Sequence, residues 1–472
     1  MSSARTPKVG LLALFVFLLF SMPRLNIKLG PVPVYAMDVV AALILYQMAL
    51  SARTAKRLTV PFRNILIVIG FFVILSEFSV LVYGGSLLDA IYISIRYFLT
   101  FGIMFAVPTL IRGRADIEIV LKGLALALLI SSLLMLLSSL PQTRGIAVFL
   151  FSIPFLEPTS AADRLLRGAA DSGVRGRTLI GVSILSGAFI SIAWPLVAYL
   201  RTQRFRLSAL WSIVSVSAVT LSPLAIVVSY SRQAAVGGIL VLLAALILPL
   251  SDLRRSLLRP FLLSVGVVLI VGVGSSLFFF DRYVNRFTAV VENPLDDVNE
   301  SARFLSYVVP FEHVVDHPQF LFVGAGATAE RSSKITIDSF KENHSLLGAG
   351  YFAHGMLSTL LLFFLIFASF RFANWHRIQA QNLAFIARGW PRSLFLAYLP
   401  ILPMAAFAPA LGTNVRAMYV FMLLLGLLAT LRNTDLIASL ETNEEPEPPV
   451  SEADNVENTA QPLHPTALPR KA

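Results

Sequence analysis

The chain has 472 residues, of which 56% are hydrophobic and only 14% are charged, and its formal net charge is +11. Soluble domains are about 45–50% apolar, so this composition excludes an ordinary soluble globule and predicts a membrane protein. The basic residues lie in short clusters between apolar runs and form no continuous stripe, which argues against nucleic acid as a partner. Cysteine is absent, so disulfides, thiolate metal sites and a cysteine nucleophile are excluded.

About twelve apolar runs are candidates to cross a bilayer as helices. They lie at 9–22, 33–50, 64–82, 87–110, 117–140, 178–200, 207–230, 234–250, 261–280, 345–370, 393–411 and 416–431. The first run follows Arg5 and Lys8, as a signal peptide would, but no small-residue cleavage site follows it, so we expect an uncleaved span. The sequence predicts an all-α, polytopic membrane domain over residues 1–432.

Five basic clusters set the expected orientation. They lie at 52–57, 112–116, 201–206, 252–259 and 371–377, each after an even-numbered run. Because cytoplasmic loops are enriched in Lys and Arg, we expect these loops and both termini on the cytoplasmic side. The alternate connections then face outward, and only those near 141–177 and 281–344 are long enough to hold much structure.

The outer segment 281–344 is expected to be a large periplasmic loop that carries interfacial helices. Its part at 300–316 has apolar residues at near-helical spacing interrupted by Pro310, which predicts a kinked amphipathic helix along the membrane face. Pro318, Gly324 and Gly326 follow and permit a tight backbone turn.

The segment 433–472 differs from the rest of the chain. It is acidic, contains several prolines and is nearly devoid of aromatic residues. Because it cannot bury enough apolar surface to fold alone, we expect a disordered cytoplasmic tail.

Four ionisable side chains fall within or near the apolar runs, where a functional role is the first hypothesis. For Asp38, Glu77 and Arg96 we favour a structural role, in which Arg96 forms an internal ion pair with one of the two acids. His354 is expected either to hydrogen-bond a neighbouring helix or to line a path for an acceptor.

Arg232 stands in the sequence SYSRQAAVGG with no acidic residue nearby, at the start of an apolar run. An arginine at membrane depth costs a few kcal/mol, so it marks a candidate site. The alternative is a side chain that extends to the membrane surface and contacts lipid phosphate.

Several segments between about 170 and 430 together resemble the O-antigen ligase and O-antigen polymerase superfamily. They are RGRTLIGVSILSGAF at 175–189, the Ser231-Arg232 pair that opens a span, the interfacial helix before DHPQFLFVGAGA, and His344 followed by Gly355. Members of this family typically read His-Asn-x-x-Leu…Glu-x-Gly at the last position. This chain has His344-Ser345 there, and Ala353 stands where the family has the acid.

The resemblance implies a metal-independent glycosyltransferase of bacterial surface polysaccharide assembly, without a cofactor, in the inner membrane. It would move a glycan from an undecaprenyl-pyrophosphate carrier to a sugar hydroxyl at the periplasmic face. The acceptor is a lipid A core in ligases and another carrier-linked glycan in polymerases. The other expected partners are membrane lipids and proteins of polysaccharide assembly.

The same resemblance suggests roles for particular residues. His344 is the candidate general base, because histidine titrates near neutrality. Arg232 is the candidate for stabilising the departing pyrophosphate, since a guanidinium meets phosphate oxygens in pairs. The candidate binding residues for pyrophosphate and glycan are Arg303, Arg286, Arg282, Arg175, Arg177 and His317.

Other readings stay open. A transporter or flippase for polysaccharide or lipid-linked oligosaccharide would also have about twelve spans. A protein oligosaccharyltransferase would need a protein acceptor. His313 and His317 are spaced as zinc ligands on a helix can be, but the sequence offers no convincing third ligand, so no metal site is expected.

Overall fold

The computed structural model describes most of the chain. The described residues are 6–22, 28–29, 32–33, 35–51, 61–82, 86–139, 143–151, 178–179, 183–202, 205, 207–248, 251–275, 298–326, 345–383, 385–407, 411 and 414–441.

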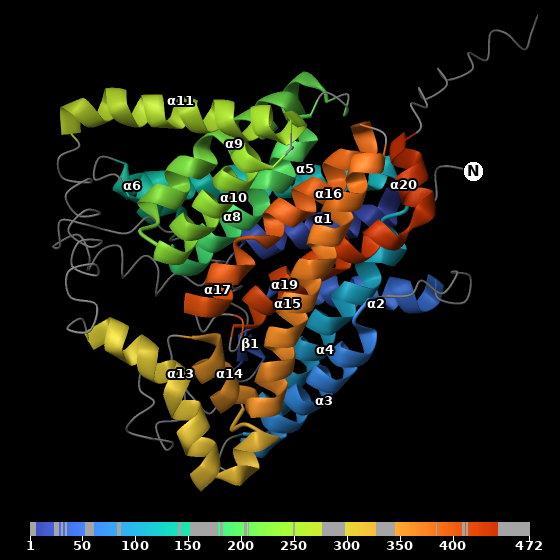
Figure 1. Ribbon diagram of the computed structural model, residues 1–472, viewed down its shortest axis with the longest axis vertical. Helices are drawn as coiled ribbons and strands as arrows, with labels where there is room; N and C mark the ends of the chain where they lie inside the picture. The colour runs from blue at the N-terminus through green and yellow to red at the C-terminus, as the bar shows by residue number, and fades with distance from the viewer. Residues whose placement is uncertain are drawn as a thin grey trace, which may run out of the picture.

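The described part is built from helices (Figure 1). They are α1 (Thr6–Ser21), α2 (Ala36–Ser51), α3 (Arg63–Ser79), α4 (Leu87–Leu110), α5 (Arg114–Ser139), α6 (Arg144–Phe151), α8 (Ser183–Leu200), α9 (Ala209–Val228), α10 (Arg232–Ile247), α11 (Ser251–Ser275), α13 (Val298–Asp316), α14 (Leu346–His354), α15 (Met356–Gln379), α16 (Phe385–Tyr398), α17 (Ile401–Phe407), α19 (Val415–Ala429) and α20 (Thr434–Glu441), with the short 3-10 helices η1 (Pro318–Leu321), η3 (Ala380–Asn382) and η4 (Thr430–Arg432). The strands β1 (Lys28–Leu29) and β2 (Val32–Pro33) form a small antiparallel pair in which Lys28 faces Pro33. The expected all-helical architecture is confirmed.

Among the described residues, five helices are long and apolar enough to cross a membrane. They are α4, α5, α9, α15 extended to Asn382, and α19 extended to Arg432. Four shorter apolar helices lie at Val9–Ser21, Ala36–Ala49, Leu185–Leu200 and Arg232–Ile247. Most described helices follow the expected apolar runs, although the run expected at 261–280 is α11, which begins at Ser251; the number of twelve spans stays a prediction.

The outer surface of the bundle is apolar, as expected for helices in contact with lipid. On α3 the large side chains Ile67, Phe71, Leu75 and Phe78 are all exposed. Their spacing of three or four residues places them on one face of the helix. Large exposed apolar surfaces are rare on soluble proteins and here suit an acyl-chain environment.

The centre of the bundle is dominated by α19, in which 94% of the 18-residue apolar window is buried. It packs along α4, while α5 packs against both α1 and α9. Polar side chains tie these helices together within the core. Ser131 donates to the carbonyl of Phe20 at 2.7 Å, and Trp194 donates to the carbonyl of Val219 at 3.1 Å.

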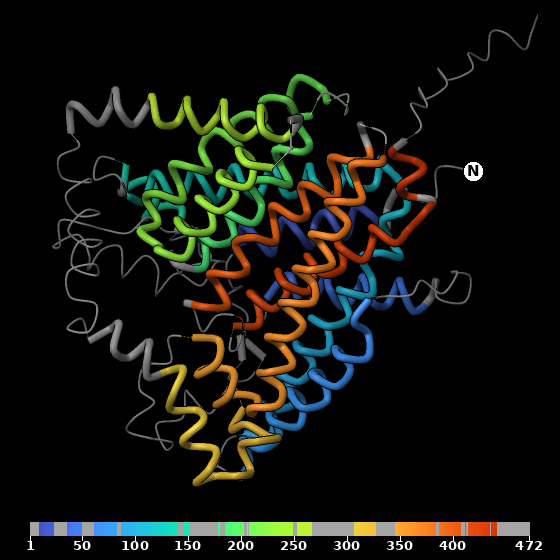
Figure 2. The backbone as a smooth tube through the Cα atoms, viewed as in Figure 1, coloured from blue at the N-terminus to red at the C-terminus, as the bar shows by residue number. Residues whose placement is uncertain are grey.

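Several basic clusters meet at one end of the bundle, which we call the basic end. The Arg114 guanidinium lies 5.3 Å from the Phe205 ring and joins the clusters 112–116 and 201–206. The Phe372 ring lies 5.4 Å from the guanidinium of Arg432 and 5.8 Å from the ring of Phe62. Helices α16 and α20 also pack together there, as Figure 2 shows in orange and red. The clusters 112–116, 201–206 and 371–377 agree with a shared side, whereas 52–57 lies outside the described residues and the orientation in the membrane stays a prediction.

Two expected apolar runs are interrupted. The run 345–370 is divided into α14 and α15 at Gly355, whose φ is +85°. The run 393–411 is divided into α16 and α17 before Ile401. Pro400 explains the second break, because a proline disfavours the helical conformation of the residue before it and has no N–H.

Two predictions about the surface elements have different outcomes. The helix expected at 300–316 is present as α13, with Pro310 inside it. The expected start of the tail at 433 is wrong, because residues 434–441 form α20. Leu436 and Leu440 of this helix are fully buried, and this burial provides the apolar contact that composition alone did not reveal. Residues 442–472 lie outside the described residues.

Candidate functional site

The end of the bundle opposite the basic end, which we call the opposite end, holds Arg232. Helix α9 begins after the cluster 201–206 and runs away from it, so α10 begins at the opposite end. Arg232 is the first residue of α10 and is half buried. The side chain of Ser231 caps the helix by accepting a hydrogen bond from the Ala234 amide at 3.3 Å. Tyr230 has φ +49°, an uncommon conformation for a side-chain-bearing residue and one that is often found at functional sites.

The start of α14 lies at this end as well. The Ser345 hydroxyl accepts from the Gly348 amide at 3.0 Å and donates to the Ser306 carbonyl of α13 at 3.3 Å. His344, the candidate base, directly precedes Ser345 but lies outside the described residues.

Helix α17 connects the two regions. It packs against α10 and against α14, and it lies between them in Figure 1. The Tyr307 hydroxyl of α13 also donates a hydrogen bond to the Ala406 carbonyl of α17. The helices that begin at Arg232 and immediately after His344 are therefore joined through one short helix.

The remaining candidate arginines lie wholly or in part outside the described residues. Arg175, Arg177, Arg282 and Arg286 lie outside the described residues. Arg303 belongs to α13, but its side chain lies outside the described part of the chain.

His317 is exposed, and its ring centroid lies 4.3 Å from that of His313. Nδ1 of His313 lies 2.6 Å from the Tyr351 hydroxyl, so this ring is held by α14. Burial lowers the pKa of His313 below its ordinary value, and the neighbouring His317 adds to this effect while Asp316 opposes it. Within the described residues, no group of three or more His, Asp or Glu side chains is arranged to hold a metal ion.

The ion pair expected for Arg96 is confirmed, with Asp38 as the partner. Arg96 Nε lies 2.9 Å from Asp38 Oδ2. The Tyr35 ring centroid lies 4.2 Å from the Arg96 guanidinium, and the Arg416 guanidinium lies 5.7 Å from the same ring. Arg416 is buried, and its position at the start of α19 resembles that of Arg232 in α10. Sequence reasoning missed it, although the same signal, an arginine opening an apolar run, was present.

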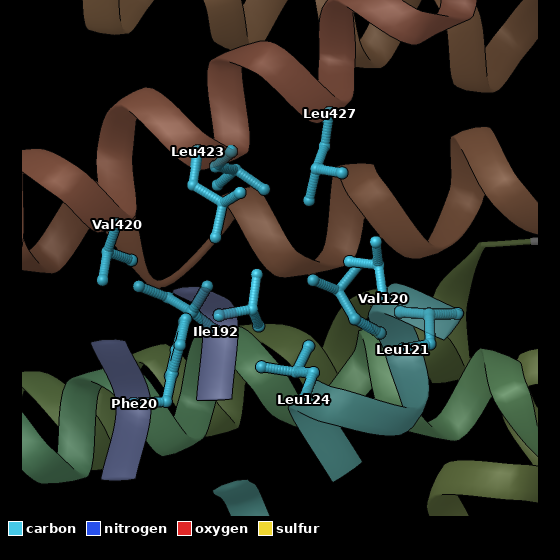
Figure 3. A pocket seen from close by; sticks show the side chains of 11 residues that line it. Phe20, Val120, Leu121, Leu124, Ile192, Val420, Leu423 and Leu427 are labelled. Atoms are coloured by element: carbon cyan, nitrogen blue, oxygen red, sulfur yellow. The ribbon is translucent and has the colours of Figure 1, made fainter. Parts of the chain in front are cut away.

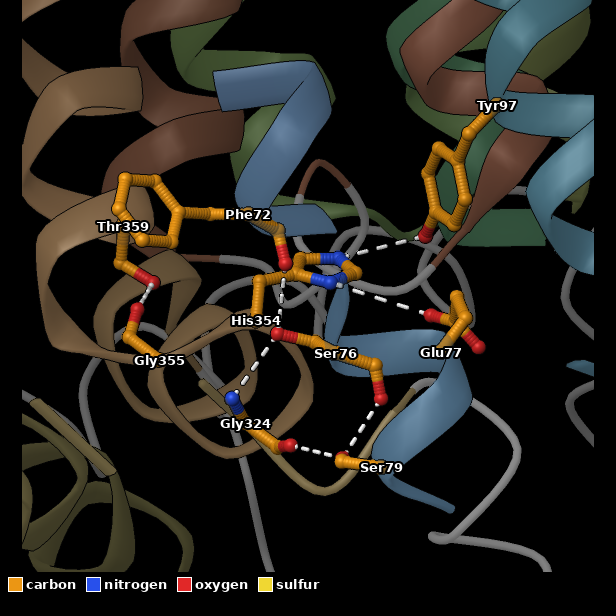
Figure 4. Close-up of polar contacts among 9 residues, drawn as sticks. All are labelled: Phe72, Ser76, Glu77, Ser79, Tyr97, Gly324, His354, Gly355 and Thr359. Atoms are coloured by element: carbon orange, nitrogen blue, oxygen red, sulfur yellow. Dashed lines mark hydrogen bonds and ion pairs between the residues drawn. The ribbon is translucent and has the colours of Figure 1, made fainter. Parts of the chain in front are cut away.

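Glu77 belongs to a second buried polar group (Figure 4). Its Oε1 lies 3.9 Å from Nδ1 of His354, which is within ion-pair range but beyond hydrogen-bond length. The other ring nitrogen, Nε2, lies 3.3 Å from the Tyr97 hydroxyl of α4. The hydrogen bond expected from His354 to a neighbouring helix is thus confirmed. Nothing local in the sequence indicated that Tyr97 and Glu77 converge on it.

Residues 322–326 pack beside this group and connect α3 to α14. The Ala325 and Gly326 amides donate to the carbonyls of Phe352 and Ala353 at 2.8 and 3.0 Å. On the other side, Ser76 accepts from the Gly324 amide at 2.9 Å, and Ser79 donates to the Gly324 carbonyl. A Cβ on Gly324 would collide with the backbone of Ala353, so the glycine permits this close approach.

One pocket lies deeper in the bundle (Figure 3). It is lined by Val16, Phe20, Val120, Leu121, Leu124, Ile192, Leu196, Val420, Leu423, Leu424 and Leu427. Its volume of about 10 Å³ and its wholly apolar lining offer neither space for a sugar nor a group for chemistry. This pocket is therefore not a candidate site for sugar chemistry.

No family model and no curated protein matches this chain.

Proposed function

We propose that this chain is a membrane glycosyltransferase that transfers a glycan from undecaprenyl pyrophosphate to a sugar hydroxyl, as its sequence resemblance implies. The single observation that supports it is the link through α17 between the helix that Arg232 begins and the helix that follows His344. If the basic end faces the cytoplasm, this region faces the periplasm of a bacterial inner membrane, where lipid-linked glycans would be presented.

The proposed reaction balances as a displacement at the anomeric carbon. The bond from that carbon to the pyrophosphate oxygen breaks, and the pyrophosphate leaves with the electron pair. The acceptor oxygen forms the new glycosidic bond, and its proton passes to the imidazole of His344. Arg232 stabilises the charge on the leaving group, with Arg303 or Arg286 as the second cation. His317 and the arginines 175, 177 and 282 remain candidates for contacts to the glycan or pyrophosphate.

The acceptor can be a second carrier-linked glycan, which makes the protein a polymerase, or a lipid A core, which makes it a ligase. We favour polymerase or a ligase-like role in exopolysaccharide assembly, because no feature of the sequence specifies a lipid A core.

A second candidate function is transport of polysaccharide or lipid-linked oligosaccharide. The break between α14 and α15 and the buried Glu77–His354 pair favour it, since transporters use discontinuous helices and buried ionisable groups. We rank it second because the unusual polar residues of the sequence concentrate in the segment 281–344, which favours chemistry at the membrane surface.

Reconstitution into vesicles with an undecaprenyl-pyrophosphate oligosaccharide tests the proposal. A ladder of products indicates a polymerase, a single transfer to lipid A core indicates a ligase, and uptake without transfer indicates a transporter. We expect Arg232→Ala and His344→Ala each to lower turnover about 100-fold or more. Arg255→Ala is the matched control, because Arg255 is an exposed arginine near the start of α11 in a basic cluster. If Arg232→Ala retains the turnover of this control, the site assignment is wrong.

A further inference from the structure

The C-terminal end of α14 is held by a buried pair of ionisable groups. The side chain of Glu77 is fully buried and that of His354 is 3% exposed. An uncompensated charge in such surroundings is costly, so the pair is favourable when one proton is shared between the carboxylate and the imidazole. This leaves the pair neutral overall. Among the described residues, the Tyr97 hydroxyl of α4 contacts His354, and Arg96, one residue earlier on that helix, is itself paired with Asp38.

Helix α14 is short, buried and rigid enough to transmit the position of one end to the other. All nine of its residues are buried. A helix of this length spans about 13 Å, so a change at His354 displaces the first turn, where Ser345 bonds to α13. Displacements of about 1 Å at a reacting group are enough to cost about 100-fold in rate.

Stability alone does not account for the pair. The backbone hydrogen bonds of residues 322–326 already fasten the end of α14 to α3. Replacing a buried ion pair with apolar side chains of similar volume is often neutral or stabilising, so the polar pair is not needed to fold the protein. The charge contact of His354 to Glu77 of α3 and its hydrogen bond to Tyr97 of α4 fix the rotation of α14 in a way that apolar contacts do not.

We infer that Glu77 and His354 are positioning residues that fix the rotation of α14 against α13. The catalytic consequence rests on the proposed function, whereas the positioning itself does not. Glu77 belongs to α3, far from α14 in the sequence, and supplies a carboxylate beside His354 at the C-terminal end of α14.

The test compares two variants of Glu77 with the wild type by hydrogen–deuterium exchange of the full-length protein in detergent. The amides at 348 and 349 bond to Ser345 and report on the first turn of α14. We expect Glu77→Leu to raise exchange there about tenfold, and Glu77→Gln to keep it near the wild-type rate, because an amide of the same shape keeps a polar group beside His354. Leu, Gln and Glu have similar volumes, so packing is matched. Amides of α9 serve as the internal reference.

A double variant, Glu77→Leu with His354→Leu, keeps the test valid if the single variant fails to fold. It removes both charges and is expected to fold with an unfolding midpoint near that of the wild type, yet to retain the fast exchange at the start of α14. Tyr398→Phe is the matched control, because it removes a buried hydrogen bond to Ser369 between α15 and α16.

Turnover in the vesicle assay separates the two proposals. In the double variant we expect kcat to fall about tenfold or more with little change in the donor KM. The proposed base would be displaced, whereas the contacts to the donor would stay in place. Unchanged exchange at 348 and 349 in Glu77→Leu and in the double variant overturns the positioning role, whatever the turnover. Fast exchange with unchanged turnover supports the positioning role and instead refutes His344 as the base.

Discussion

Arg96 and Asp38 join α4 to α2 through a contact of 2.9 Å, with side chains that are 8% and 9% exposed. Asp38 lies in the first turn of α2, and Arg96 lies within α4, a helix that is long and apolar enough to cross a membrane. Each charge is compensated by the other, and the Tyr35 ring covers the guanidinium. The pair therefore serves the packing of these two helices.

Removing one partner of this pair leaves a buried charge without compensation. We expect Asp38→Leu or Arg96→Leu alone to lower the free energy of unfolding by about 3–5 kcal/mol, and the double variant to lose less than the sum. Denaturant unfolding in detergent measures this. Glu118→Gln is the control, because the Glu118–Lys122 pair of α5 is more exposed and worth at most about 1 kcal/mol. Equal losses in Asp38→Leu and in this control would contradict the structural role.

The sequence was sufficient to predict most of the long helices. A helix that spans a membrane needs about 20 consecutive apolar residues, and such runs can be read directly from the sequence. It also indicated that Arg96 pairs with an acid, since a charge at that depth requires a partner. Which of the two acids, Asp38 or Glu77, pairs with Arg96 depends on the tertiary packing of the helices. The two acids lie on different helices, and hydropathy does not specify which helix packs beside α4.

The interruption at Gly355 could not be predicted from hydropathy, because the run 345–370 is apolar on both sides of it. The break depends on the approach of the Phe322 backbone, which comes from a distant part of the chain. The Glu77–His354–Tyr97 group has the same origin, since it is assembled from α3, α14 and α4. Contacts of this kind are tertiary and leave no local pattern.

Gly355 provides a direct test of this break. Its φ of +85° and ψ of +164° lie in a region that is essentially restricted to glycine, and a Cβ there would lie 2.8 Å from the carbonyl carbon of Phe322. We expect Gly355→Ala to cost about 2–4 kcal/mol from strain and overpacking together.

Gly10→Ala is the matched control for Gly355→Ala. Gly10 lies within α1, and a Cβ there would meet nothing within 4 Å. Alanine favours a helix over glycine by about 1 kcal/mol, so the control should be unchanged or more stable. The prediction fails if Gly355→Ala unfolds at the same denaturant concentration as Gly10→Ala.

His313 gives the stability of the α13–α14 contact a pH dependence. Its pKa is lowered in the folded protein, first by burial and then by His317, so the unfolded chain binds its proton more readily. The contribution is therefore complete above about pH 6.5, the ordinary histidine value, and is lost as the pH falls through the lowered pKa.

Thermal unfolding midpoints between pH 8 and pH 5 measure this contribution. We expect the midpoint of His313→Gln to fall less on acidification than that of the wild type. His317→Gln should have an intermediate slope, because it removes one of the two causes of the lowered pKa and leaves the burial of His313 in place. Identical slopes for wild type and His313→Gln would show that this histidine is not the group responsible.

The buried residues of α20 extend the folded domain past the point where composition suggests a tail. Leu440 is fully buried, and α20 packs against α16 and α5. Leu440→Ala removes apolar contact and leaves a cavity, so we expect a loss of about 2–5 kcal/mol in the free energy of unfolding. Leu210→Ala in α9 is the control, because its side chain is 65% exposed on the outside of the bundle and its removal leaves no cavity. If the two variants unfold alike in detergent, the packing of α20 against α16 does not contribute to the stability of the domain.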